Sequence, residues 1–299
     1  MNYAYADIYT FELPAGHRFP IEKYRLCRER LIAEGTVEAG QLVVPELCPR
    51  EVLEGVHHPD YVDRTFEGRL SRIEIRRLGF PWSETLVRRS LCSVAGTIQA
   101  AEYALREGAG GNFAGGTHHA YPDHGEGFCV FNDIAVAARH LQMRGLVERV
   151  AVVDCDVHQG NGTAFIFRED SRVFTLSLHG KNNYPFEKEQ STLDVELEDG
   201  VGDEEYLDHL EDALEEVFRF HPQIVFYLAG VDTLKNDRFG KLSMTLDGLK
   251  ERDRLVLSEA RKRDLPVAIA FGGGYAELLE DVVEAHANTY RIAESLFPG

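Results

Sequence analysis

The sequence predicts an α/β fold in which a mostly parallel sheet is covered by helices on both faces. Strand-like apolar runs alternate with helical patterns over most of the 299 residues, as is typical of proteins with parallel sheets. The apolar runs are continuous rather than alternating in polarity, which indicates strands buried on both faces. Because no internal repeat, low-complexity tract or Pro/Ser-rich linker divides the sequence, we expect one domain over residues 1–299.

The strands and helices are predicted from their hydrophobic patterns. The strands are the apolar runs Arg149–Asp154, Val173–Leu178, Gln223–Ala229 and Leu265–Phe271. The clearest helix covers Asp203–Phe220, where apolar side chains recur every three or four residues and acidic residues lie at the positive end of the helix dipole. Further helices are predicted over Glu84–Glu107, Asn132–Met143, Leu246–Arg263 and Glu277–Leu296. The acidic stretch Asp194–Glu205 is interpreted as a solvated strand edge that runs into the start of a helix.

The composition indicates a folded protein with excess negative charge. Apolar residues make up 44% of the sequence and charged residues 27%, which excludes wholesale disorder. The 32 Lys and Arg against 50 Asp and Glu give a formal net charge of −18. Sequence-independent nucleic-acid binders need clustered basic residues, so we expect no nucleic-acid partner. Cationic or neutral ligands suit this charge better.

The sequence also favours a reducing, cytoplasmic environment. The first residues lack the basic and apolar regions of a signal peptide, and no apolar run approaches the ~18 residues of a membrane span. We therefore expect a cytoplasmic protein with no membrane span. The cysteines are odd in number and show no CxxC spacing, so neither a disulfide framework nor a thiolate zinc site is predicted for Cys27, Cys48, Cys92, Cys129 and Cys155.

The segment that follows the first predicted strand carries the most informative polar groups. The two-residue period of an extended chain places Asp154, Asp156 and His158 on one side. A carboxylate and an imidazole in this position are suitable ligands for a divalent metal. Asp232 follows another predicted strand, and parallel sheets bind ligands at the carboxyl ends of their strands. We therefore expect Asp156, His158 and Asp232 to converge on a metal.

Two further strand ends carry groups useful in catalysis. The tandem His118-His119 follows an apolar and glycine-rich segment, and Gly272–Tyr275 (GGGY) follows the last predicted strand. Each feature alone has a plainer interpretation. An aspartate after a strand is often a helix cap, a lone histidine often packs in a partly buried position, and GGGY could be a tight turn or a weak phosphate-binding site. Their joint occurrence at four strand ends favours a functional site.

These motifs resemble those of the zinc-dependent histone deacetylases. The tandem-histidine region of that family is matched by Gly115–Ala120 (GGTHHA), Gly127-Phe128-Cys129 and Asn132-Asp133. The remaining signatures are similar, in the same order, to Val153–Gly162, Ala229–Asp232 and Gly272–Tyr275. Class IV members and their microbial relatives are most similar at Gly16–Pro20, His158–Gly162 and Gly230–Ser243.

The resemblance implies the three-layer α/β/α arginase/deacetylase fold and a metal centre. One zinc ion per chain would be held by Asp156, His158 and Asp232, the ligand set already reached from the strand ends. A structural monovalent cation, potassium or sodium, is implied nearby. It would be held by the Ser177 hydroxyl and by the backbone carbonyls of Asp154, Asp156, His158 and Leu178.

The resemblance also assigns catalytic roles. His119 would act as general base and then as general acid. His118, oriented by Asp154, would remain largely cationic and stabilise negative charge. The Tyr275 hydroxyl would donate a hydrogen bond to the developing oxyanion.

Three residues would form the narrow tunnel for the acyl-lysine stem: Gly127, Phe128 and Tyr184. One position departs from many deacetylases, because Asn161 stands where they carry an aspartate behind the second histidine. Without that negative charge we expect His119 to be less basic. Class IV members share this asparagine, so the departure does not imply an inactive enzyme.

The implied activity is removal of acetyl or longer acyl groups from the ε-amino group of lysine in a protein or peptide. An acetylpolyamine amidohydrolase is an alternative, because the acidic composition would attract a polycation as readily as a lysine-rich peptide. A non-catalytic acyl-lysine-binding protein is a further alternative, against which the retained Tyr275 weighs. An arginase-type dinuclear site is disfavoured because Gly160 stands where a carboxylate is needed. Acyl chain length and oligomeric state are left open.

Overall fold

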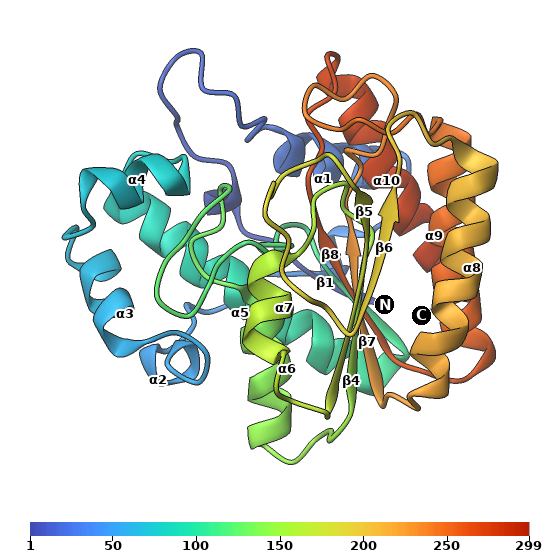
Figure 1. Cartoon of the computed structure of the whole chain (residues 1–299), viewed down its shortest axis with the longest axis horizontal. Coiled ribbons are helices and arrows are strands. Elements are labelled where there is room, and N and C mark those ends of the chain that lie inside the picture. The colour runs from blue at the N-terminus through green and yellow to red at the C-terminus, as the bar shows by residue number, and fades with distance from the viewer. Residues whose placement is uncertain (299) are drawn as a thin grey trace.

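The computed structural model describes residues 1–298 and arranges them around one sheet of eight parallel strands (Figure 1). The strand order is β2-β1-β3-β8-β7-β4-β5-β6, so that β8 and β7 lie between β3 and β4 although they come last in the chain. The strands are β1 (Asn2–Ala4), β2 (Leu42–Val43), β3 (Ala109–Asn112), β4 (Val150–Asp154), β5 (Val173–Gly180), β6 (Leu193–Leu197), β7 (Ile224–Ala229) and β8 (Val267–Phe271).

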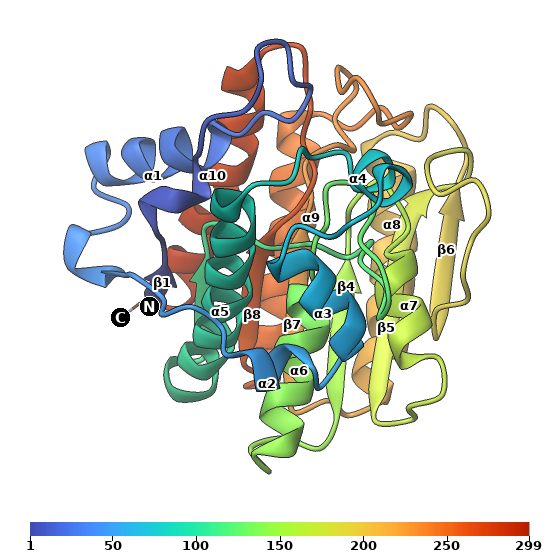
Figure 2. The same cartoon turned by 90° about the vertical axis from the view of Figure 1, so that its left-hand side faces the viewer.

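Helices cover both faces of the sheet (Figures 1 and 2). One face is covered by α5 and α6, with α7 beside them and α2, α3 and α4 outside. The other is covered by α8, α9 and α10, with α1 packed on α10. No helix within residues 1–298 has both the length and the apolar character needed to cross a membrane. The helices are α1 (Lys23–Ala33), α2 (Arg50–Leu53), α3 (Pro59–Phe66), α4 (Arg72–Leu78), α5 (Glu84–Glu107), α6 (Asp133–Met143), α7 (Asn161–Phe167), α8 (Asp203–Arg219), α9 (Leu246–Lys262) and α10 (Leu279–Leu296), with 3-10 turns at Asp7–Tyr9 and Ala39–Gln41.

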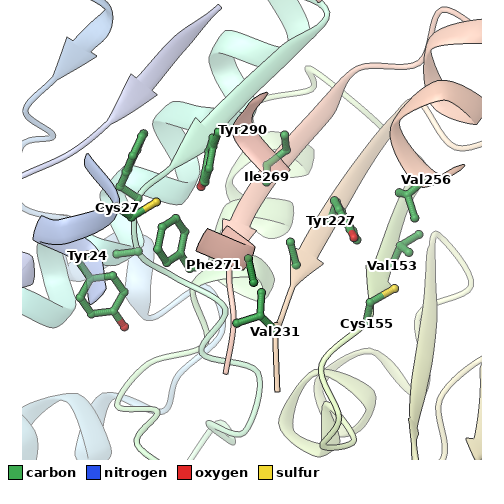
Figure 3. Close-up of a cluster of buried hydrophobic side chains, with 14 of the residues drawn as sticks. Tyr24, Cys27, Val153, Cys155, Tyr227, Val231, Val256, Ile269, Phe271 and Tyr290 are labelled. Atoms are coloured by element: carbon green, nitrogen blue, oxygen red, sulfur yellow. The ribbon is translucent and has the colours of Figure 1, made fainter. Parts of the chain in front are cut away.

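The central strands bury both of their faces. On β4, Val150 and Val152 belong to the core under α5 and α6, whereas Val153 belongs to the core under α8, α9 and α10. On β8, Ala268 points to the first core and Ile269 to the second. Figure 3 shows part of the second core, with Val153 and Ile269 among its labelled side chains. Successive side chains of a strand point to opposite faces, which explains why these runs are continuously apolar rather than alternating in polarity, apart from Asp154 at the end of β4.

The predicted fold class is confirmed, and each predicted strand and helix forms within a few residues of its expected bounds. The strand predicted over Leu265–Phe271 begins only at Val267, because Pro266 has no N–H to donate to the ladder. The acidic stretch is an edge strand, β6, that leads into α8, as interpreted from the sequence.

The strands on the β2 side of the sheet lack a strong sequence signal. β1 and β2 have only three and two residues, and β3 has the sequence AGGN, which is poor in β-branched and aromatic side chains. β3 nevertheless pairs along its whole length with β8. Its pairing with neighbouring strands, rather than its own propensity, therefore determines its conformation.

His57 joins the outer helices to the start of α6. Its side chain is 1% exposed, with Nδ1 3.0 Å from the carbonyl oxygen of Tyr121 and Nε2 accepting a hydrogen bond from the Asn132 N–H at 3.0 Å. A neutral imidazole with its hydrogen on Nδ1 satisfies both partners, whereas a second proton on Nε2 would face the Asn132 N–H. Burial lowers the pKa of His57 from 6.5 to about 4.

We predict that His57 makes the protein less stable in mild acid. Because its folded pKa is below the unfolded one, stability is lost as the pH falls from 6.5 towards 4. At pH 5 the loss relative to pH 7 is about 2 kcal/mol. Urea denaturation of the wild type and of His57→Gln at both pH values measures it. The variant should lack this part of the pH dependence, whereas the exposed control His209→Gln should retain it. The same pH dependence in wild type and His57→Gln contradicts the assignment.

Candidate active site

Four neighbouring strands deliver polar groups to one edge of the sheet. β3, β8, β7 and β4 are adjacent in the sheet, and the loops after their carboxyl ends carry the groups singled out in the sequence. A cavity of about 390 Å³ is lined by His119, His158 and Tyr275 among others. A smaller recess of about 40 Å³ shares these three side chains and adds His118 and Asp156. The structure thus brings together residues that are up to 157 positions apart, from His118 to Tyr275.

Asp156, His158 and Asp232 form a cluster of potential metal ligands, with one ligand atom of each within 4.8 Å of the others. His158 Nδ1 lies 2.9 Å from Asp156 Oδ1 and 3.1 Å from Asp232 Oδ2. Backbone N–H groups hold the other carboxylate oxygens. Gly273 donates to Asp156 Oδ2 at 2.6 Å, and Val157 donates to Asp232 Oδ1 at 2.9 Å. One oxygen of each carboxylate therefore remains turned towards His158 Nδ1.

The electrostatics of this cluster fit a divalent cation. Asp156 and Asp232 are both fully buried, and burial together with the charge of Asp156 raises the pKa of Asp232 to about 7. Although burial alone would lower it, hydrogen bonds to the two carboxylates raise the pKa of His158 to about 10. Two buried carboxylates that face one imidazole nitrogen need positive charge between them. Two oxygens and one nitrogen are a donor set that zinc accepts, so these residues fit a zinc ion.

His118 is paired with a buried carboxylate. Its Nδ1 is 2.6 Å from Asp154 Oδ2, and its Nε2 is 3.9 Å from Asp156 Oδ1. Burial alone would lower the pKa of His118, but the charges of Asp154 and Asp156 raise it to about 9. An imidazole in this setting is protonated at neutral pH.

His119 has the opposite character. Its Nδ1 is 2.6 Å from Asn161 Oδ1, which is neutral, and its ring packs against the ring of His118 with centroids 4.1 Å apart. Burial, followed by the positive charges of His118 and His158, lowers the pKa of His119 well below 6.5. The two adjacent histidines are thus split into one cation and one neutral base, an arrangement suited to acid–base chemistry.

Phe128 and Tyr184 both line the larger cavity, as do Gly127 and His119. The Tyr184 ring meets His119 edge-on at 5.2 Å between centroids. Gly127 has φ = +56° and packs so closely on His119 that a Cβ would lie 2.6 Å from Cδ2 of the imidazole. Only glycine satisfies both conditions. The three predicted tunnel residues therefore share one cavity.

Tyr275 is 7% exposed and lines both the cavity and the recess. Its backbone N–H donates to Asp237 Oδ2 at 2.6 Å, which fixes the end of the GGGY segment. Burial, followed by the charges of Asp156 and Asp232, raises the pKa of Tyr275 well above 10, so its hydroxyl keeps its hydrogen and can donate it.

Comparisons with known proteins bear on the family of the chain. The histone deacetylase domain pattern matches residues 17–290 of the chain. Histone deacetylase 2 of Arabidopsis thaliana is 33% identical over 294 residues, which cover 93% of this chain and 76% of that protein. The chain belongs to the histone deacetylase family.

Two other comparisons extend over nearly the whole chain. An uncharacterized protein of Picosynechococcus sp. is 47% identical over 297 residues, or 98% of each chain. The solved structure of an acetylpolyamine aminohydrolase from Burkholderia pseudomallei has a TM-score of 0.82 at 22% identity and covers 99% of both chains, which shows a shared fold. These comparisons do not distinguish class IV from the other branches of the histone deacetylase family.

The monovalent cation remains a prediction for this chain. Sheet register places Ser177 of β5 directly beside Asp154 of β4, with Leu178 next to it. The Ser177 hydroxyl oxygen lies 3.0 Å from His179 Nδ1 and 3.4 Å from the Gly160 N–H. Three of the predicted ligand residues, Asp154, Ser177 and Leu178, thus lie side by side.

Sequence reasoning missed a buried arginine behind the metal ligands. Arg252 of α9 is 0% exposed. Its guanidinium donates to the carbonyl oxygen of Gly230, two residues before Asp232, and to that of Cys155, the residue before Asp156, at 3.4 Å. One cation therefore links the two loops that carry the carboxylates.

A buried aspartate neutralises Arg252. Asp253 Oδ1 is 2.7 Å from Arg252 Nη2, and the hydroxyls of Tyr227 and Thr289 donate to the same carboxylate at 2.5 and 2.6 Å. In the sequence, Arg252-Asp253 on a charged helix looks like ordinary solvated surface, so only the packing of α9 reveals this network.

Two more buried charged residues support the site: Lys23, which has no sequence signal, and Asp133, whose role was not predicted although it belongs to the Asn132-Asp133 motif. Lys23 is 1% exposed and donates from Nζ to the Gly272 carbonyl at 2.7 Å, behind the GGGY segment. Asp133, 0% exposed, accepts hydrogen bonds from the N–H groups of Gly116 and Thr117 at 3.1 and 2.7 Å and so holds the loop before the tandem histidines.

We predict that Arg252→Met impairs both stability and metal binding. The substitution leaves Asp253 as an unpaired buried charge, which should lower the free energy of unfolding by about 3–5 kcal/mol. Zinc affinity should also fall, because the two ligand loops lose their shared anchor. Urea denaturation of the metal-free protein and competition for zinc with a chelator measure the two effects. The surface control Arg263→Met, which breaks a pair with Glu259, should cost about 1 kcal/mol or less. If the folded Arg252→Met variant binds zinc with unchanged affinity, Arg252 contributes to stability and not to metal binding.

Proposed function

We propose that this protein is a zinc-dependent hydrolase that removes acyl groups from the ε-amino group of lysine in peptides or proteins. One observation carries the proposal. An Asp-His-Asp cluster, one charged and one neutral histidine, and a protonated tyrosine lie together at the carboxyl edge of the sheet. Membership of the histone deacetylase family supports the same reaction. On the features around Gly16–Pro20 and Asn161 we assign the protein to the class IV branch.

The metal would be held by Asp156, His158 and Asp232, whose donor set fits zinc. When bound, zinc polarises an acyl carbonyl and lowers the pKa of a water molecule. The potassium or sodium ion would lie behind this centre, held by the Ser177 hydroxyl and by carbonyls of Asp154, Asp156, His158 and Leu178. It would offset part of the carboxylate charge in the cluster.

The two histidines have separate roles. His119 donates from Nδ1 to Asn161, so its Nε2 is the nitrogen free to take a proton from water and to return it to the departing lysine amine. His118, kept cationic by Asp154, stabilises the negative charge that develops on the substrate. The low pKa of His119 and the raised pKa of His118 fit these separate roles.

Tyr275 and the cavity walls complete the mechanism. The Tyr275 hydroxyl would donate to the carbonyl oxygen as that oxygen gains negative charge. Phe128 and Tyr184 would enclose the apolar stem of the acyl-lysine and exclude bulk water from the reacting amide.

The mouth of the cavity favours an acyl-lysine over an acylpolyamine. The exposed cations Arg18, Arg77 and Lys241 line the cavity, and no carboxylate is among the described residues that line it. Lys241 lies 3.9 Å from Asp199, whereas neither arginine has a carboxylate within 4.0 Å in residues 1–298. A polyamine keeps further ammonium groups close to its acylated nitrogen, and these would meet like charge. A peptide presents a neutral backbone there.

We predict that Tyr275→Phe keeps the metal and loses most turnover. Removing one oxyanion donor should lower kcat by about 100- to 1,000-fold with zinc content unchanged. Asp156→Ala should lose both zinc and activity, since it removes a ligand. Zinc analysis and turnover of a series of acyl-lysine peptides, from acetyl to myristoyl, test both variants. Full activity of Tyr275→Phe would exclude the oxyanion role.

We further predict that Arg18→Glu/Arg77→Glu shifts specificity towards polyamines. The ratio of kcat/KM for an acetylated polyamine to that for an acetyl-lysine peptide should rise about tenfold or more at low ionic strength and less in high salt. The charge-matched control Arg254→Glu/Arg261→Glu on α9 should leave the ratio unchanged. A ratio that already favours polyamines in the wild type would overturn the lysine assignment.

A further inference from the structure

A buried carboxylate is linked to His119 through one intervening side chain. Asn161 Oδ1 accepts from His119 Nδ1, and Asn161 Nδ2 donates to Glu126 Oε1 at 2.7 Å. Glu126 is 9% exposed and belongs to the loop between His119 and Phe128. An amide therefore bridges the imidazole and a carboxylate, where many deacetylases place an aspartate directly against the histidine.

Glu126 keeps its negative charge despite burial. Burial alone would raise its pKa, but hydrogen bonds from His124, Asn161 and Tyr184 lower the pKa of Glu126 to about 2. His124 Nε2 lies 3.8 Å from Glu126 Oε2. An ionised carboxylate can only accept hydrogen bonds, so each group that faces Glu126 has to donate.

This requirement fixes which way Asn161 points. In the observed orientation its NH2 group donates to Glu126 and, at 3.2 Å, to the Tyr121 hydroxyl. If the amide were reversed, its carbonyl oxygen would face the Glu126 carboxylate and its NH2 group would face His119 Nδ1. Two acceptors in contact repel, so the charge of Glu126 selects the observed orientation.

The orientation of Asn161 in turn fixes the hydrogen on His119. A carbonyl oxygen 2.6 Å from Nδ1 requires that Nδ1 carries the hydrogen. The other nitrogen, Nε2, is then the acceptor available on the cavity side. The reversed amide would favour the opposite tautomer and leave His119 with no free acceptor towards the cavity.

We propose that Glu126 is a positioning residue that sets the tautomer of His119 through Asn161. The inference rests on the proposed function, because the tautomer matters for catalysis only if His119 accepts a proton there. Asn161 and Glu126 together would take the place of the single aspartate of other deacetylases. The Asn161 amide makes the hydrogen bond to His119, and the Glu126 carboxylate determines the orientation of that amide.

Opposite effects of one substitution in two backgrounds test this proposal. In the wild type, Asn161→Asp places a second carboxylate against Glu126, so both kcat and the melting temperature should fall. In a Glu126→Gln background the new amide can donate to the new carboxylate, so Asn161→Asp should raise both. Glu126→Gln alone should lower kcat about 10- to 100-fold, with KM and zinc content unchanged. A role in loop stability alone would give Asn161→Asp the same sign in both backgrounds.

A matched control and a direct readout complete the test. Glu189 accepts from the Tyr121 hydroxyl at 3.0 Å and makes no hydrogen bond with Asn161 within residues 1–298, so Glu189→Gln should leave kcat and the sign of the Asn161→Asp effect unchanged. The 15N shifts of histidine-labelled, metal-free protein, assigned with His119→Asn, should show the Nδ1–H tautomer in the wild type and a shift towards Nε2–H in Glu126→Gln.

The outcomes separate this proposal from the proposed function. If the wild type hydrolyses no acyl-lysine peptide, the function fails, while the melting temperatures and 15N shifts still decide the role of Glu126. An Nε2–H tautomer in the wild type overturns the proposal even if Glu126→Gln does not fold. The same sign for Asn161→Asp in both backgrounds also overturns it.

Discussion

The site depends on the burial of two carboxylates against a single imidazole nitrogen. Asp156 and Asp232 can lie together at the edge of the sheet only where hydrogen-bond donors and positive charge compensate them. Backbone N–H groups supply part of this, including that of Gly273. A Cβ at position 273 would lie 1.8 Å from Asp232 Oδ2, so the chain can approach the carboxylates only as glycine. Arg252 then ties the two ligand loops from behind.

The sequence was informative about the fold wherever burial is continuous. β7, β8 and all of β4 except its last residue, Asp154, are continuously apolar because helices cover both of their faces, and α5 and α8 show helical periodicity because each has one buried face. β1, β2 and β3 could not be predicted in this way, since they are short and their conformation is imposed by strands that are distant in the sequence. α1 likewise has no clear amphipathic pattern in its sequence.

The candidate ligands were predictable because their signal is local. Asp156 and His158 are two residues apart after a strand, and the topology of a parallel sheet brings Asp232 to the same edge. Arg252, Lys23 and Glu126 were missed for the opposite reason. A charged residue on a helix or in a loop is normally solvated, so a sequence pattern assigns it to the surface. Each of these is buried because it forms a hydrogen bond with a residue more than 20 positions away in the chain.

The charge of the whole chain and the charge at the cavity mouth act on different length scales. The net charge of −18 acts on molecules that approach the protein surface. Dissolved ions weaken its effect over about 8–10 Å at physiological salt. A substrate entering the cavity is closer than that to Arg18 and Arg77 and meets local positive potential. Many of the excess carboxylates lie on solvated segments such as α8, where water and ions screen their effect on the reaction. The sign of the net charge is therefore a poor guide to the substrate, and the side chains that line the mouth are the better one.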